Sequence, residues 1–354
     1  MDTGASSEIA RPMPANARRS RLVDGLIVPP THLELPAVDH CNLTCGGCNH
    51  ASPAMPAWFA DPDTVYRDFS VLAKVYRPSF IKVLGGEPLM HKNLSGVLEA
   101  ARAAGMGSRL MLVTNGVLLH KAPDAVWEQV DEMELSIYPG VEGVEDNARL
   151  AKERMKAMGK RLTVYRYGQF RATFSLKGTA DQALIQKVYA ACKMANYWGC
   201  HGVRDGYFYK CPQSMYAGRL AGRIAESDRI ALADRPTLQA ELLAFANSLQ
   251  PLAACAHCVG SVGIQEPHAL PARGDWRSAI DRTSEELIDY DWLEKSLVRF
   301  DDPDDCKIKV RKEKRGILKR WPWLRRLRGK PPVAADMPMG PGRRTIPIER
   351  AGKQ

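Results

Sequence analysis

The stretch that decides the fold is Cys41-Asn42-Leu43-Thr44-Cys45-Gly46-Gly47-Cys48, in which three cysteines stand within one short loop. It follows Leu33–Asp39, whose alternating apolar residues predict a strand. Thiolates in proteins bind zinc or iron–sulfur clusters. Three thiolates are one short of a closed tetrahedral site, and in a four-iron cluster they leave one iron open to a substrate. The stretch therefore predicts a metal site with an open coordination position.

The C-x3-C-x2-C spacing resembles the motif of the radical S-adenosylmethionine (radical SAM) superfamily. A second landmark of that family is the turn Gly85-Gly86-Glu87-Pro88, which follows the apolar run Phe80–Leu84, a predicted buried strand. The resemblance implies that a [4Fe-4S] cluster with S-adenosylmethionine is held by Cys41, Cys45 and Cys48. It also implies that the amino group of S-adenosylmethionine is bound at Gly85, Gly86 and Glu87.

The resemblance is close over residues 33–170 and looser as far as residue 258. Gly47 departs from it, because many family members carry an aromatic residue at this place that packs on the adenine. We therefore expect other groups, chiefly backbone groups, to hold the adenine in this chain.

Strand and helix patterns alternate after the cysteine loop, and the strands are apolar, which predicts an α/β fold with a parallel sheet covered by helices. The resemblance implies a partial (βα)6 barrel like that of the family. The predicted strands are 33–39, 80–84, 110–114, 133–138 and 161–165, with 172–176 as the candidate sixth, and the predicted helices begin near 61, 94, 122 and 144. In parallel barrels the chemistry lies at the carboxyl ends of the strands, where the cysteines and Glu87 fall.

Two polar residues also fall at predicted strand ends. Ser136 resembles the family's fourth-strand serine, whose hydroxyl contacts the ribose or carboxylate of the cofactor. The alternative is a serine that bonds to its own backbone. Asn115, in Thr114-Asn115-Gly116, is predicted to be a turn residue rather than a ligand. No catalytic residue is assigned from the sequence.

A second group of cysteines is Cys192, Cys200, Cys211, Cys255 and Cys258. Asp205-Gly206 is a hairpin signal, and pairing about it places Cys200 opposite Cys211. Cys255 and Cys258 form a compact two-ligand knuckle. The favoured four-thiolate set is therefore Cys200, Cys211, Cys255 and Cys258, with Cys192 as the alternative ligand.

This second group resembles the twitch or shortened SPASM extension, which follows the family's barrel and binds one auxiliary [4Fe-4S] cluster. Gly206 and Cys211 match its Gly-x4-Cys pattern. A structural zinc site made by the same thiolates is the alternative. A spare thiol near the active site would instead serve as a hydrogen-atom donor, as an epimerase requires.

The chain has 354 residues, nine of them cysteines, and 45% are hydrophobic, so it can bury a large core. No apolar run approaches the roughly 20 residues that span a bilayer, and no export signal precedes the first strand. These features predict a cytoplasmic protein whose thiols stay reduced, which favours metal ligation over disulfides. Cys306 stands alone and is expected to be a surface thiol.

The formal net charge of +10 is concentrated in residues 311–330, which hold ten Lys or Arg and one Glu. Because this basic segment also contains Trp and Leu, it is compatible with docking to a membrane surface or a protein partner; a solvated basic tail is the equal alternative, and no specific nucleic acid is expected. The expected division is a flexible N-terminus, the barrel, the auxiliary-cluster domain and a basic, largely disordered tail, at 1–30, 31–180, 181–300 and 301–354.

The resemblance implies a radical SAM oxidoreductase that takes electrons from a donor such as flavodoxin or ferredoxin. Residues 1–30 are too few for the leader-peptide module of peptide-modifying relatives, so we expect a small-molecule substrate, such as a sugar or an aminocyclitol, that is oxidised or epimerised. The alternatives are a peptide-modifying maturase and, in another class, a non-catalytic zinc-binding scaffold.

Overall fold

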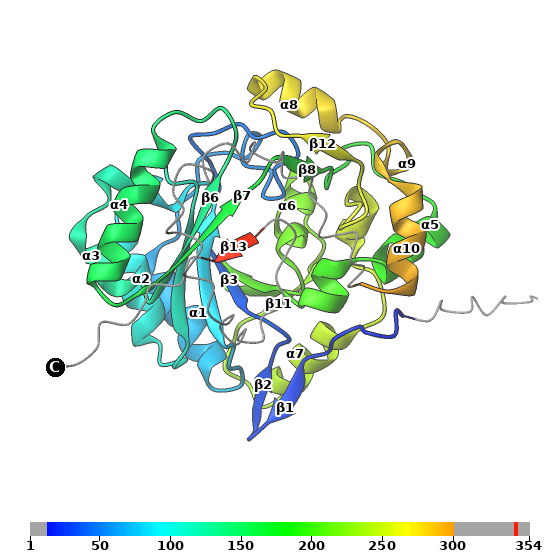
Figure 1. Cartoon of the computed structure of the whole chain (residues 1–354). Helices are drawn as coiled ribbons and strands as arrows, with labels where there is room; N and C mark the ends of the chain where they lie inside the picture. The colour runs from blue at the N-terminus through cyan, green and yellow to red at the C-terminus, as the bar shows by residue number, and fades with distance from the viewer. Residues whose placement is uncertain (1–12, 301–342, 346–354) are drawn as a thin grey trace, which may run out of the picture.

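The computed structural model describes residues 13–300 and 343–345, and a mixed nine-stranded sheet lies at its centre (Figure 1). The strand order is β11-β10-β9-β3-β4-β5-β6-β7-β13. Strands β3 to β7 run parallel to one another, which confirms the α/β prediction. Their bounds are Leu33–Val38 (β3), Phe80–Gly85 (β4), Arg109–Thr114 (β5), Glu132–Ile137 (β6) and Arg161–Arg166 (β7).

The connections between these strands are helical and pack on one face of the sheet (Figure 1). The helices are α1 (Pro62–Ala73), α2 (Leu94–Ala103), α3 (Asp124–Gln129) and α4 (Val144–Ala157). Helix α1 begins where the sequence predicts, because Asp61 accepts a hydrogen bond from Thr64 N at 2.9 Å and Pro62 takes the first helical position. Apolar side chains of these helices and of the strands between them form the largest buried core.

The prediction of a sixth strand at 172–176 is wrong. Only Phe174 forms a bridge there, with Cys258, and the segment hydrogen-bonds to residues 257–264 instead of to β7. The place beside β7 belongs to the antiparallel strand β13 (Arg343–Thr345). Within the described residues the sheet therefore stays open and does not close into a barrel.

The chain after residue 180 extends the same sheet from its other side. Strand β9 (His201–Arg204) runs parallel to β3 and forms a hairpin with β10 (Tyr207–Tyr209), as Asp205-Gly206 predicts. Strand β11 (Arg229–Ala231) completes this edge. The boundary expected near residue 180 thus divides two segments that share one sheet.

The remaining elements surround this edge. A short ribbon joins β8 (Gln169–Arg171) to β12 (Gln265–Pro267). The helices are α5 (Gln182–Ala190), α6 (Pro212–Leu220), α7 (Leu238–Asn247), α8 (Arg273–Ile280), α9 (Ser284–Leu287) and α10 (Tyr290–Val298).

Part of the N-terminal segment expected to be flexible is folded. Strands β1 (Arg21–Val23) and β2 (Leu26–Val28) form a hairpin across Asp24 and Gly25, both of which have positive φ. Asp-Gly between apolar residues is a strong hairpin signal, so the local sequence does encode this turn. Asn247 of α7 exchanges two hydrogen bonds with the Ser20 backbone, which ties this hairpin to the body.

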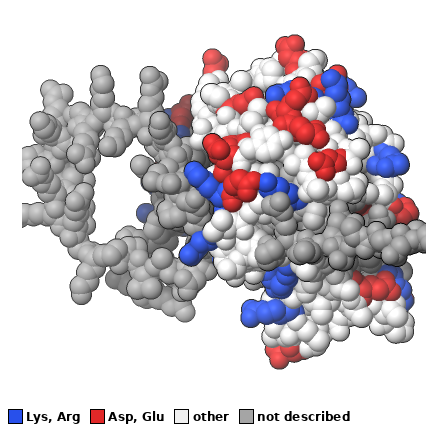
Figure 2. Space-filling model, turned by 90° about the vertical axis from the view of Figure 1, so that its right-hand side faces the viewer, with Lys and Arg blue, Asp and Glu red and all other residues white. Residues whose placement is uncertain are grey.

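On the face in Figure 2, acidic side chains gather in the upper part and basic side chains lie among and below them. Among the described residues, no helix combines the length and the apolar character needed to cross a membrane. The predictions about Cys306 and about the 311–330 tail lie outside the described residues.

Candidate metal and cofactor sites

The cysteine loop leaves the carboxyl end of β3, as predicted. Its three thiols are close enough for their charges to interact, because a charge on Cys48 raises the pKa of both Cys41 and Cys45. Burial is the larger cause, and it raises the pKa of Cys41 to about 12. Thiols that resist ionisation in this way become thiolates once a metal ion supplies the compensating charge.

The Gly85-Gly86 turn lies directly against the chain that leads into the loop. A Cβ on Gly85 would stand 2.0 Å from the Val38 carbonyl oxygen, and a Cβ on Gly86 would stand 1.8 Å from the His40 oxygen. Gly86 N donates to Val38 O at 2.8 Å. Only glycine permits this approach, so the turn and the cysteine loop are built as one unit.

Glu87 is fully buried beneath this turn. Its carboxylate accepts hydrogen bonds from Thr114 Oγ1 at 2.7 Å, Asn115 N at 2.8 Å and Leu89 N at 3.1 Å. Burial raises the pKa of Glu87 to about 7, although these donors oppose the rise. The carboxylate therefore fastens the turn after β4 to the end of β5. Since Glu87 is already engaged in these bonds, the backbone of Gly85 and Gly86 is the better candidate for cofactor binding.

Asn115 has a larger part in the site than its sequence suggested. Its Nδ2 lies 3.6 Å from Cys41 Sγ and donates to Asn42 Oδ1 at 2.7 Å. Ser136 lies buried near the end of β6, close enough to Tyr138 to oppose slightly the rise that burial causes in the pKa of that phenol. The structure thus brings Asn115 to the cysteine loop, while Ser136 contacts an aromatic residue beside it.

His50 follows the third cysteine closely in sequence, and its Nε2 lies 3.9 Å from Oε2 of Glu34, a buried carboxylate on β3. Burial alone would raise the pKa of the Cys48 thiol, but hydrogen bonding to His50 outweighs it and lowers that pKa. The pKa of His50 rises to about 9, because the favourable influence of Cys48 and Glu34 on the charged imidazole outweighs burial. A positive charge beside Cys48 favours the thiolate that a metal needs.

A stack of aromatic rings stands beside Cys45. Tyr138 and His268 stack with centroids 5.1 Å apart, and Phe170 lies 5.6 Å from Tyr138. His268 Nε2 is 3.3 Å from Cys45 Sγ. A Cβ on Gly47 would meet Phe170 at 2.9 Å, so the glycine makes room for an aromatic residue that comes from β8.

The segment around β12 and α8 covers the cysteine loop. Trp276 Nε1 donates to Cys45 O at 3.0 Å, Gly46 N donates to Ala269 O at 2.9 Å, and Arg273 bonds to Pro53 O at 2.9 Å. Residues more than 200 positions apart in sequence therefore hold the loop. No sequence motif indicates this cover.

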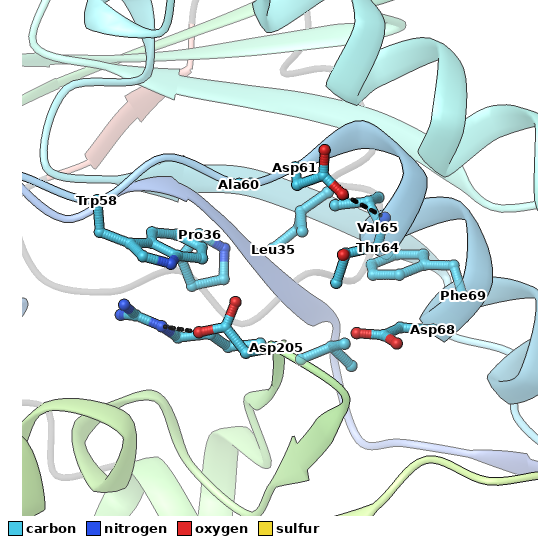
Figure 3. Close-up of a pocket in the computed structure, with 12 residues that line it drawn as sticks. Leu35, Pro36, Trp58, Ala60, Asp61, Thr64, Val65, Asp68, Phe69 and Asp205 are labelled. Carbon is cyan, nitrogen blue, oxygen red and sulfur yellow. Dashed lines mark hydrogen bonds and ion pairs between the residues drawn. The ribbon is translucent and has the colours of Figure 1, made fainter.

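A buried ion pair links the β9–β10 hairpin to the start of the loop. Arg204 Nη1 bonds to both carboxylate oxygens of Asp39 at 2.6 and 2.7 Å, and its guanidinium lies 3.8 Å from the centre of the Trp58 ring. Figure 3 shows Trp58 and Asp205 in the adjoining pocket, which is lined by residues from β3, α1 and the hairpin. The pair fixes Asp39, two residues before Cys41.

A second set of thiols lines a separate pocket, whose walls are mainly apolar. The four cysteines in it are Cys192, Cys211, Cys255 and Cys258. Burial raises the pKa of all four thiols, and charge on neighbouring members raises the pKa of Cys211, Cys255 and Cys258 further. Gly260 N lies 3.3 Å from Cys258 Sγ, and a Cβ on Gly260 would meet Cys192 Sγ at 2.9 Å.

Cys200 does not join this pocket. The β9–β10 pairing ends at Gly202 and Tyr209. Cys211 lies beyond it, as the residue that directly precedes α6. Cys200 Sγ instead lies 3.8 Å from Thr31 Oγ1 and 4.0 Å from His32 Nδ1. Atoms of His32, Glu34 and Cys200 lie within 4.8 Å of one another, away from the four-cysteine pocket.

Both donor sets fit iron–sulfur clusters. Three clustered thiols with an adjoining polar turn suit a four-iron cluster with one open iron, and four thiols in one closed apolar pocket suit a fully ligated cluster. The same four thiols also suit zinc, because both metals take thiolate ligands.

The chain is similar to several solved structures. BtrN in complex with AdoMet and 2-DOIA has 17% identity and a TM-score of 0.38, over 62% of this chain and 82% of that chain. Histidine-tagged anSMEcpe with bound AdoMet has 14% identity and a TM-score of 0.38, over 61% and 80%. Streptococcus suis SuiB bound to S-adenosylmethionine has 17% identity and a TM-score of 0.30, over 39% and 34%.

All three structures contain bound AdoMet, which is S-adenosylmethionine. No family model matches the chain, and the search of curated proteins likewise found no match.

Proposed function

We propose that the chain is a radical SAM enzyme, in which Cys41, Cys45 and Cys48 hold a [4Fe-4S] cluster with one iron open to S-adenosylmethionine. The observation that carries the proposal is the joint construction of the cysteine loop and the Gly85-Gly86 turn, whose backbones meet too closely for any side chain. When bound and reduced, this pair supplies a 5′-deoxyadenosyl radical that abstracts hydrogen from an unactivated C–H bond.

The residues around the loop bind and orient the cofactor in this proposal. The Gly85-Gly86 backbone receives the amino group of S-adenosylmethionine, and Glu87 holds that turn in place through its three donors. Ser136 remains a candidate contact for the ribose or carboxylate of the cofactor. Asn115 and His268 surround the cluster ligands, and such outer contacts fix ligand orientation and basicity.

The adenine has a candidate surface despite Gly47. Tyr138, Phe170 and His268 form an aromatic stack next to Cys45, and the missing side chain of Gly47 is what admits Phe170. Aromatic faces provide stacking surfaces for a planar heterocycle. We expected backbone groups to hold the adenine, and this stack is the better candidate.

The second cluster is assigned to Cys192, Cys211, Cys255 and Cys258, with Cys192 in place of Cys200. Their shared pocket supports this set. A cluster held by these four thiols would supply an acceptor for the electron left on a substrate radical, and loss of one hydrogen atom, one proton and one electron would complete a two-electron oxidation. Reduced flavodoxin or ferredoxin is the proposed electron donor for the first cluster.

The substrate is proposed to be a small molecule, such as a sugar or an aminocyclitol. The support is the cover formed by Ala269, Arg273 and Trp276, which close over the loop with direct hydrogen bonds. Such a cover suits a small molecule better than an extended peptide, and it excludes water from the radical.

The test is a cleavage assay on anaerobically reconstituted full-length protein with dithionite and S-adenosylmethionine. We expect 5′-deoxyadenosine to form, and deuterium from a C-deuterated sugar or aminocyclitol to appear in it. Deuterium transfer only from peptides would favour a peptide-modifying maturase. Colourless protein that contains zinc, contains no iron and forms no 5′-deoxyadenosine would contradict the proposal and favour a zinc-binding scaffold.

A further inference from the structure

Lys210 is the last residue before Cys211, and its side chain is completely buried. Its ammonium donates to the Tyr189 hydroxyl and to the Ser248 carbonyl. An ammonium has three N–H donors, so one of them has no acceptor in the part of the chain that the structure describes.

Lys210 also has no carboxylate partner within residues 13–300. The other cation that acts on it, Arg19, adds repulsion. Burying a cation without a counter-charge costs several kcal/mol, and buried lysines are therefore rarely left unpaired. An anion beside the Lys210 ammonium would remove this cost, and no carboxylate in residues 13–300 provides one.

The thiols of the second site adjoin this charge, because Lys210 directly precedes Cys211 and its partner Tyr189 lines the four-cysteine pocket. Lys210 Nζ lies 5.2 Å from the centre of the Tyr189 ring. A lysine ammonium is a cation with three N–H donors, so this side chain is placed to pair with thiolates in that pocket.

We propose that Lys210 is the buried counter-ion of the four-thiolate centre and sets its reduction potential. Four thiolates outweigh the charge of an oxidised four-iron core, and one-electron reduction makes the centre more negative by one charge. A fixed cation in a low-dielectric pocket stabilises the reduced state more than the oxidised state. Lys210 thereby makes the centre a better acceptor for the electron of a substrate radical, an inference that rests on the proposed second cluster.

A matched set of variants separates the charge of Lys210 from its size and its hydrogen bonds. Lys210→Met removes the charge and keeps the length, Lys210→Gln removes the charge and keeps hydrogen-bonding capacity, and Lys210→Arg keeps the charge. Lys187→Met on α5 is the control, because Glu294 already pairs with that lysine and its side chain is not among those that line the pocket.

The measurement is an EPR-monitored redox titration of the reconstituted full-length chain, in which Cys41, Cys45 and Cys48 are replaced by Ala so that only the second centre remains. We expect Lys210→Met and Lys210→Gln to lower the midpoint potential by about 59 mV or more, a tenfold change in the ratio of reduced to oxidised centre. Lys210→Arg and Lys187→Met should leave it near the parent value. A structural role in joining Tyr189 to Ser248 would not move the potential.

Unchanged potentials in both neutral variants would overturn the inference. If neutral variants fail to bind iron while Lys210→Arg binds it, the requirement for charge is supported, whereas loss of iron in the Arg variant as well would contradict it. If the parent chain itself binds no iron at this site, the proposed second cluster fails, and that result is distinct from any failure of Lys210.

Discussion

The two cysteine sites differ in how many thiols they offer and in what surrounds them. The loop at Cys41–Cys48 has three thiols, a glycine-built turn and a stack of aromatic rings beside it. The pocket of Cys192, Cys211, Cys255 and Cys258 has four thiols, mainly apolar walls and a buried lysine. The two sites therefore differ in construction, since glycine backbone adjoins the chain that leads into the three-thiol loop, whereas mainly apolar side chains surround the four thiols.

The difference between the two sites is tested most strongly by removing one thiol from each. Cys45→Ala should abolish 5′-deoxyadenosine formation, because the open iron requires the other ligands in place. Cys258→Ala should keep cleavage of S-adenosylmethionine measurable while it lowers substrate oxidation. Liquid chromatography of 5′-deoxyadenosine checks both variants, and equal loss of cleavage in the two would contradict the division of labour.

Two variants, at Cys192 and at Cys200, test which thiols are the ligands of the second site. Cys192→Ala should remove the iron of the second centre, about four per chain, because its thiol lines the pocket. Cys200→Ala should retain that iron, since its thiol lies beside Thr31 and His32. Iron and sulfide analysis of the reconstituted variants decides between them, and the reverse result would restore Cys200 as the ligand.

Gly86 and Gly105 test the construction of the first site. A methyl group on Gly86 would stand 1.8 Å from a backbone oxygen, so Gly86→Ala should cost on the order of 3 kcal/mol and displace the loop. Gly105 has positive φ but open space around it, so Gly105→Ala should cost about 1 kcal/mol and leave cluster binding intact.

Urea unfolding followed by circular dichroism, together with iron analysis, measures both effects. Similar stability and iron content in the two glycine variants would contradict the close packing of turn and loop.

The smallest effect concerns His201 on β9, a buried histidine whose Nδ1 lies 2.7 Å from the Tyr76 hydroxyl. Burial lowers its pKa to about 3 in the folded protein, against about 6.5 when unfolded. The unfolded state therefore binds the proton more readily between these values, and stability is complete above pH 6.5 and falls as the pH drops. This group should cost about 2 kcal/mol between pH 7 and pH 5.

His201→Gln should flatten that part of the pH profile. Urea unfolding at several pH values measures how steeply the free energy of unfolding changes with pH. His32 and other groups contribute to this slope in both proteins. Identical slopes in the variant and the parent would show that His201 does not carry this proton uptake.

The sequence predicted local features well, because they depend on neighbouring residues. The cysteine loop, the glycine turn, the Asp61 cap and the Asp205-Gly206 hairpin are encoded within a few positions of each other. Five parallel strands followed from alternating strand and helix patterns.

Features that depend on distant partners could not be predicted. Residues 172–176 are apolar enough for a strand, but their backbone finds partners at 257–264. Cys200 and Cys211 are symmetric about the hairpin, yet β9 also pairs with β3 and carries Cys200 to Thr31. His268 and Trp276 reach Cys45 from the far part of the chain, and no local pattern indicates such contacts.

The central claim is that the chain has two iron–sulfur centres, one open and one closed. The most direct test is the iron content and the cleavage activity of three proteins: the parent, a variant without the three loop cysteines and a variant without the four pocket cysteines. We predict about eight, four and four irons per chain, with cleavage in the first and third only. Four irons in the parent that the pocket variant retains, or zinc in place of iron, would contradict the account.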